Sequence, residues 1–207
     1  MSKFKLLPAF RRAYRMTLAF YAFILLSSIA WGYRIWVEDP VLAKATIERI
    51  IETKFATIVE RMTNTGWWGQ VLIIFGNNLK AAAFIIISGL FIPILPLLMG
   101  IMTNGMMIGL MLGFFETEKL LRKTTFFLSL LPHGFFEVPA ILLSATVGMI
   151  WGGRNWRSIF GGGSFGTLGA HAEASLAYLP LIILLFFIAA LMEVLVTPRF
   201  VILPGFA

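Results

Sequence analysis

Residues 71–115 read VLIIFGNNLKAAAFIIISGLFIPILPLLMGIMTNGMMIGLMLGFF. This stretch holds two apolar windows, Val71–Phe91 and Leu97–Phe115, and each has about the length that crosses the hydrocarbon core of a bilayer. The short segment between them contains Pro93 and Pro96, which predict a tight turn between two helices. Because a backbone in lipid must satisfy its own hydrogen bonds, the sequence predicts a helical hairpin inside a membrane.

Three further windows of similar length flank this hairpin: Met16–Trp36, Phe126–Ile150 and Ala177–Val196. The 207 residues are 59% hydrophobic and 13% charged, with a mean hydropathy of +0.88, which excludes an ordinary soluble domain. We therefore expect one membrane domain over residues 1–207, an all-α polytopic bundle of about five spans. Pro132 and Pro139 interrupt the fourth window and predict a kink or a re-entrant piece there.

Basic residues give the chain a formal net charge of +7 and gather at the ends of the apolar windows. This placement favours contact with anionic lipid headgroups and argues against nucleic-acid binding. Residues 1–15 form a basic arm without acids, so the positive-inside rule predicts a cell-membrane protein with a cytoplasmic N-terminus. The basic residues of this arm are Lys3, Lys5, Arg11, Arg12 and Arg15. The chain has no cysteine, which excludes disulfides and thiolate metal sites.

Residues 39–64 predict an amphipathic helix between the first two spans. Asp39 is placed to cap its N-terminus, with Pro40 in the first turn. Its apolar side chains recur at helical spacing, opposite Glu48 and Glu52, at positions Ile47, Ile51, Phe55, Ile58 and Met62. We expect this helix to lie at the outer interface, either packed on the bundle or free to bind a partner.

A few polar residues fall inside the predicted spans, where each needs a partner or a cavity. They are Asn77, Asn78, Lys80, Asn104, His133, Glu137 and Glu193. His133 and Glu137 share one helical face with a lane of small residues at Ala140, Ser144 and Gly148. Converting sequence position into depth, at about 1.5 Å per residue, places most of these groups in the outer half of the membrane. We therefore expect one polar cluster, in which Lys80 neutralises a carboxylate.

Two glycine patterns carry further predictions. Gly105, Gly109 and Gly113 recur every four residues, so a neighbouring helix can approach the backbone of the third span closely. The glycine-rich segment 161–169 predicts a flexible loop, with His171 in a solvated position after it.

Several motifs then point to a family. Leu131–Ala140, LPHGFFEVPA, resembles the LPHGxxExPA motif of the stage II sporulation protein M family. Phe75–Lys80 is similar to its NNL motif, and Thr103–Gly105 to its NG element. Ala189–Glu193, followed by Thr197 and Pro198, resembles its C-terminal AAxxE and TP ending. The resemblance covers a core of residues 71–198.

This resemblance implies a five-span membrane protein. The family's namesake is a membrane scaffold in sporulating bacteria, where it holds two peptidoglycan-degrading enzymes. By analogy, we expect a non-enzymatic scaffold or assembly protein without a cofactor. Its expected partners are the lipid bilayer and membrane or cell-envelope proteins, including a second copy of the chain.

Other interpretations of the buried polar groups stay open. Histidine, glutamate and asparagine on facing helices are what a transporter or channel needs for an ion or solute pathway. The spacing of His133 and Glu137 also places two metal ligands on one face, although no third ligand is fixed by spacing. In a purely structural role, the same groups would only bond across helices and fix their packing.

Overall fold

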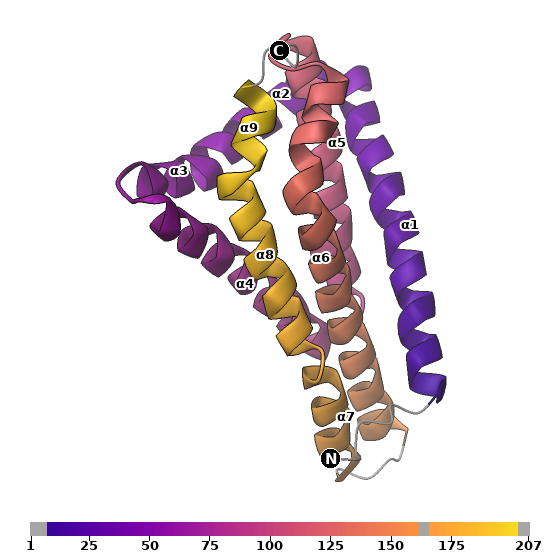
Figure 1. The fold of residues 1–207 in the computed structure, drawn as a ribbon. Coiled ribbons are helices and arrows are strands. Elements are labelled where there is room, and N and C mark those ends of the chain that lie inside the picture. Colours follow the sequence, from indigo (N-terminus) through magenta and orange to yellow (C-terminus); the bar gives the residue numbers. More distant parts are fainter. Residues whose placement is uncertain (1–7, 162–165, 203–207) are drawn as a thin grey trace.

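The structure is a computed structural model that describes residues 8–161 and 166–202, and every regular element in that part is a helix (Figure 1). The first half contains α1 (Pro8–Glu38), α2 (Pro40–Ile50), a π-helix η1 (Ile51–Phe55), α3 (Ala56–Thr63) and α4 (Trp67–Phe91). The second half contains a π-helix η2 (Pro96–Met102), α5 (Thr103–Thr117), α6 (Lys123–Phe160), α7 (Gly166–Leu176), α8 (Leu179–Leu195) and α9 (Thr197–Ile202).

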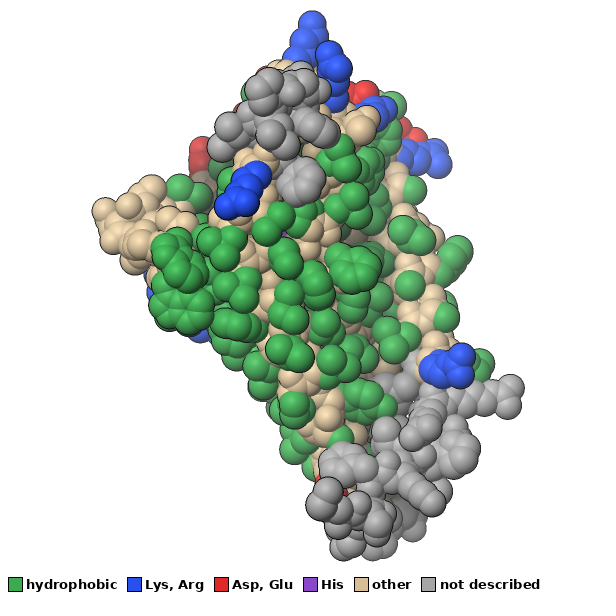
Figure 2. All heavy atoms as spheres, in the orientation of Figure 1, with side chains coloured by type: hydrophobic (Ala, Val, Ile, Leu, Met, Phe, Trp, Pro, Cys, Tyr) green, Lys and Arg blue, Asp and Glu red, His purple; other side chains and the backbone are tan. Residues whose placement is uncertain are grey.

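Five segments of the described chain are long and apolar enough to cross a membrane, which confirms the predicted all-α bundle of about five spans. They are Arg15–Glu38, Trp67–Phe91, Pro96–Thr117, Lys123–Phe160 and Leu168–Arg199. On the face shown in Figure 2, hydrophobic side chains cover the middle of the molecule. Lys, Arg, Asp and Glu gather mainly toward the upper end, as expected where a bundle leaves the hydrocarbon.

The centre of the bundle is formed by α4, α6 and α8. Their shared core comprises Ala82, Ile86, Ala140, Leu143, Val147, Ile182 and Phe186. Near one end of α4, an added Cβ on Gly152 of α6 would overlap the carbonyl oxygen of Gly89. Small residues thus bring the two backbones into direct contact, which is how helices commonly associate in lipid.

The glycine seam of α5 lies against α1. An added Cβ on Gly105 would sit 2.7 Å from the carbonyl oxygen of Leu25, and one on Gly109 would overlap that of Ile29. At Gly113 the neighbour is the ring of Trp36. The exact four-residue repeat therefore matches one continuous line of contact with α1.

The fourth span is one uninterrupted α-helix, α6, of 38 residues. The predicted re-entrant piece is wrong, because the helix runs without a break through Pro132 and Pro139; the predicted kink stays a prediction. Packing against neighbouring helices compensates for the hydrogen bonds that a proline removes from a transmembrane helix.

The predicted loop over residues 161–169 is only partly described, since residues 162–165 lie outside the described ranges. From Gly166 the chain is helical in α7, which packs on α6. The interpretation of His171 as a loop residue was wrong. His171 is half-buried in α7, and its Nδ1 lies 3.3 Å from Oδ1 of Asn155.

The basic N-terminal arm was predicted over residues 1–15. The helix α1 begins at Pro8, so Arg11, Arg12 and Arg15 belong to it, while Lys3 and Lys5 lie outside the described ranges.

Between α1 and α4, the chain forms a helical arm that comprises α2, η1 and α3. Asp39 caps α2 as predicted, because its carboxylate accepts a hydrogen bond of 3.0 Å from the backbone N–H of Leu42. The first half of the arm is packed, with Ala43 and Ile47 buried against Trp36 and Leu110. Figure 1 shows that α3 then points away from the bundle and that α4 returns from its tip.

Candidate functional site

The antiparallel helices α6 and α8 meet in one register along their interface. His133 Nδ1 lies 3.0 Å from Oγ1 of Thr197, at the start of α9. One turn further along α6, Glu137 interacts electrostatically with Glu193, which lies one turn before Thr197. Ala140 and Phe186 continue the same interface in the apolar core. The structure thus brings three predicted polar residues, His133, Glu137 and Glu193, to one end of the α6–α8 interface.

All three side chains are half-buried, and the pair of carboxylates has no cation bound to it among the described residues. In that part of the chain, no group of three histidine, aspartate or glutamate side chains is arranged to hold a metal ion. The geometry therefore gives no support to the metal-site interpretation. These three residues can hold a proton or pass one between the two carboxylates, or they can fix the packing of α6 on α8.

The polar residues of α4 do not all join this group. Consecutive residues of a helix point about 100° apart, so Asn77 and Asn78 face different ways. Asn78 is half-buried on the side of α4 that carries the core residues Ile74 and Ala82. Asn77 and Lys80 are exposed and line a groove between α3 and α4 instead. The single predicted cluster is thus divided, and Lys80 makes no ion pair with Glu137 or Glu193.

Asn104 lies apart from both sets. Its side-chain amide donates a hydrogen bond to the carbonyl oxygen of Gly100, one turn earlier in the same segment. This bond joins the π-helix η2 to the start of α5, beside Gly105 of the seam with α1. The structure therefore gives Asn104 a local role at the junction of η2 and α5.

Sequence reasoning missed a polar network at the ends of α1, α5 and α6. Tyr33 donates a hydrogen bond of 2.8 Å to Glu116, and Lys123 pairs with Glu116 at 3.0 Å. Trp36 Nε1 donates to Thr117 at 2.8 Å. The contacts that Tyr33 and Trp36 make with α5 and Lys123 join residues 81 to 90 positions apart in the chain, so no local spacing could reveal them. A usable signal was that Glu116, Thr117 and Lys123 lie just outside the apolar windows, while Tyr33 and Trp36 lie at the end of one.

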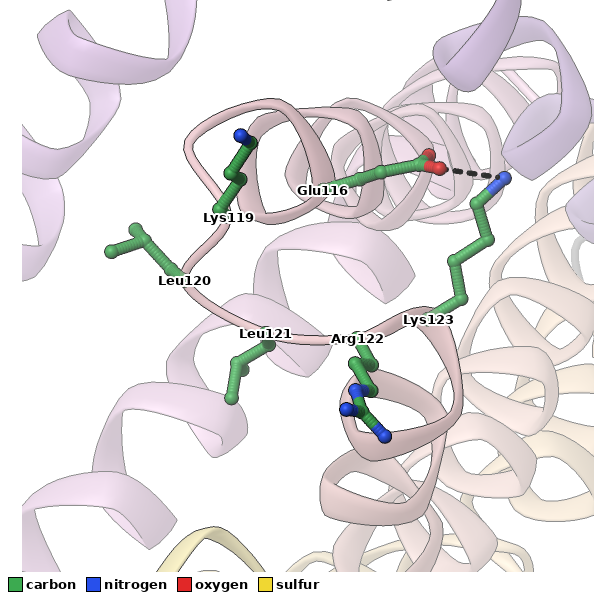
Figure 3. A pocket seen from close by; sticks show the side chains of 6 residues that line it. All are labelled: Glu116, Lys119, Leu120, Leu121, Arg122 and Lys123. Atoms are coloured by element: carbon green, nitrogen blue, oxygen red, sulfur yellow. Dashed lines mark ion pairs between the residues drawn. The ribbon is translucent and has the colours of Figure 1, made fainter. Parts of the chain in front are cut away.

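The loop between α5 and α6 borders this network and forms a shallow pocket of about 540 Å³. Figure 3 shows the Glu116–Lys123 pair on one side, while Lys119, Leu120 and Arg122 point in different directions around the loop. Since these groups do not converge on one point, the pocket lacks the arrangement expected of a small-molecule site.

The His133–Thr197 contact leads to a prediction about the C-terminal segment. Thr197→Val keeps the shape of the side chain but removes the hydroxyl, so the variant should lose about 0.5–1.5 kcal/mol of stability. Thermal unfolding in a mild detergent would measure the loss. The matched control is Thr46→Val, because Thr46 is also half-buried but donates its hydroxyl hydrogen bond to the carbonyl oxygen of Leu42 in its own helix. Equal stability of the two variants would contradict a structural contribution from the His133 contact.

Comparison with known proteins bears on the whole chain. The family model described as stage II sporulation protein M matches residues 19–198. The match begins within α1 and thus includes the helical arm, upstream of the 71–198 core that carries the motifs. No match was found among curated proteins or among solved structures. Because the model covers most of the chain and the described helices supply five candidate spans, this multi-pass membrane protein belongs to the stage II sporulation protein M family.

Proposed function

We propose that this protein is a non-enzymatic membrane scaffold or assembly protein, and that the helical arm is its partner-binding surface. One observation carries the proposal: none of the eight residues of α3 is buried, although the arm is firmly anchored at its other end. Only Ile58 and Met62 are half-buried, and the other six side chains of α3 are exposed, so most of its surface is available to another molecule.

The anchor of the arm supports this interpretation. Ile47 is fully buried, and Ala43 is nearly so, against α1 and α5. On the exposed side, the ammonium of Lys44 donates a hydrogen bond of 2.6 Å to the carboxylate of Glu118. This hydrogen bond and the negative charge of Glu118 raise the pKa of Lys44. Because its base is rigid, α3 is held in one position. Less conformational entropy is then lost when a partner binds.

The experiment that tests the scaffold is co-purification from native membranes in a mild detergent. We expect a stoichiometric protein partner with the unaltered chain and its loss with Val59→Arg, because Val59 is a large exposed apolar residue of α3. The control is Ile159→Arg, at an exposed apolar residue near the C-terminal end of α6, two residues beyond Arg157 and away from the arm. A partner retained by Val59→Arg, or lost equally from both variants, would contradict the arm as the binding surface.

The proposal places the arm on the outer side of the membrane and the N-terminus in the cytoplasm. Since the chain has no cysteine, single cysteines can be introduced at Lys5 and at the exposed Thr53 without a background signal. We expect a membrane-impermeant thiol reagent to label Thr53→Cys in intact cells and Lys5→Cys only after the cells are opened. Labelling of both positions in intact cells would overturn this topology.

A transporter or channel is the second candidate, and the interacting carboxylates of Glu137 and Glu193 favour it. Ionisable groups within spans are costly and often mark a pathway. Neither the pocket beside α5 nor the groove beside α4 is lined by these two residues. Ion flux into proteoliposomes that is abolished by Glu137→Gln would favour this candidate over the scaffold.

A further inference from the structure

A groove between α3 and α4 has no role in the functions considered so far. It encloses about 320 Å³ and combines two cations with an apolar wall. Arg61 of α3 and Lys80 of α4 are its cations, and Asn77 adds an amide beside them. Ile58 and Leu72 contribute to the wall.

The two cations are unsatisfied within the described side chains. Arg61 and Lys80 are both exposed, and the three ion pairs in the described part of the chain involve other residues. Lys80 lies 13 residues beyond Trp67, which corresponds to about 20 Å along the axis of α4. An ammonium at such a position in a span is costly unless an anion or water reaches it. The two cations therefore favour binding of a negatively charged group in the groove.

The apolar wall of the groove indicates which kind of anion can bind there. Leu72 is 49% exposed although it lies within a span, so its surface faces either lipid or a ligand. A free inorganic anion would make no favourable contact with this apolar surface. An anionic phospholipid has both parts, since its phosphate can contact the two cations and Asn77 while an acyl chain follows the apolar residues.

We propose that the groove between α3 and α4 binds one anionic phospholipid, with its phosphate held by Arg61, Lys80 and Asn77. This inference is independent of the scaffold proposal, because it concerns the side of α3 that faces α4 rather than the side that faces away.

Gly76 offers a way to close the groove without altering its charge. This glycine lines the groove, and an added Cβ would meet nothing within 4 Å. Gly76→Phe should therefore fill the space that the lipid needs while leaving the helix contacts of α4 intact.

The test is native mass spectrometry of the full chain, purified in a mild detergent and titrated with phosphatidylglycerol, phosphatidylcholine or inorganic phosphate. We expect one phosphatidylglycerol to bind preferentially. The double variant Arg61→Gln/Lys80→Gln should bind it about 10- to 30-fold more weakly, because each cation near a lipid surface contributes a few-fold in affinity. Gly76→Phe should also lose it, whereas Arg122→Gln, at an exposed cation outside the groove, should bind as the unaltered chain does.

Three results would overturn the proposal. They are undiminished binding of phosphatidylglycerol by the double variant, equal binding of phosphatidylcholine, and equal binding of inorganic phosphate. A fourth result would also overturn it: a dimer that is lost on Arg61→Gln/Lys80→Gln would show that a second copy of the chain, rather than a lipid, supplies the anion. Thermal unfolding of each variant separates loss of binding from loss of fold.

Discussion

Gly109→Ala should destabilise the bundle strongly, although alanine is the better helix former. The added Cβ would overlap the carbonyl oxygen of Ile29 and lie 2.6 Å from the backbone nitrogen of Tyr33. Backbone atoms cannot swing away as a flexible side chain can, so α1 and α5 would have to separate. Overpacking of this kind costs about 1–3 kcal/mol, and occasionally more.

Gly153→Ala is the matched control for this substitution. Gly153 lies inside α6, and an added Cβ there would meet nothing within 4 Å. The variant should keep or gain stability, since alanine is favoured over glycine in a helix by about 0.5–1 kcal/mol. Thermal unfolding of both proteins in the same detergent makes the comparison. Equal melting temperatures would show that the α1–α5 seam is looser than its geometry indicates.

Glu137→Ala and Glu193→Ala should each destabilise the protein, and their effects should not add. Removing either carboxylate changes the electrostatic environment of the other, because the two interact across the α6–α8 interface. Residues coupled in this way show interaction energies of about 0.5–3 kcal/mol in a double-mutant cycle. Each single variant should lose about 0.5–3 kcal/mol, because truncation of a half-buried side chain removes its packing between α6 and α8, while the repulsion between the two carboxylates is relieved.

Glu60→Ala provides the control for this cycle. Glu60 is exposed on α3, which packs on η1 and α4 rather than on α6 or α8. A cycle between Glu137 and Glu60 should therefore be additive within about 0.3–0.5 kcal/mol. Additivity in the Glu137–Glu193 cycle as well would contradict a shared network at the α6–α8 interface.

Much of the fold could be predicted because lipid imposes simple rules. Span length identified the five candidate spans, and the capping preference of aspartate identified the start of α2 at Asp39. The continuity of α6 through Pro132 and Pro139 could not be predicted, because the energy that maintains it comes from neighbouring helices. The helix over residues 166–176 could not be predicted either, because its glycines favour a loop when the sequence is considered alone.

The candidate site was predicted less completely than the fold. Helical spacing grouped His133 with Glu137 on one face, and depth along the span placed Glu193 near them; these three residues lie at one end of the α6–α8 interface. Depth alone does not give the direction in which a side chain points, so it also assigned Asn77 and Lys80 to this group. Their actual position in the groove depends on the rotation of α4 and on the return of α3, which no local pattern contains.

The length of α6 has a consequence for the choice of membrane. Its 38 residues extend about 57 Å, whereas a typical hydrocarbon core is about 30 Å thick. A bilayer a few ångströms thicker or thinner can therefore be matched by tilting this helix or shifting it along the membrane normal. No helical hydrogen bond of α6 has to break, so this helix sets no narrow limit on membrane thickness, and the shorter spans, such as the 22 residues of Pro96–Thr117, set the thickness that the bundle matches.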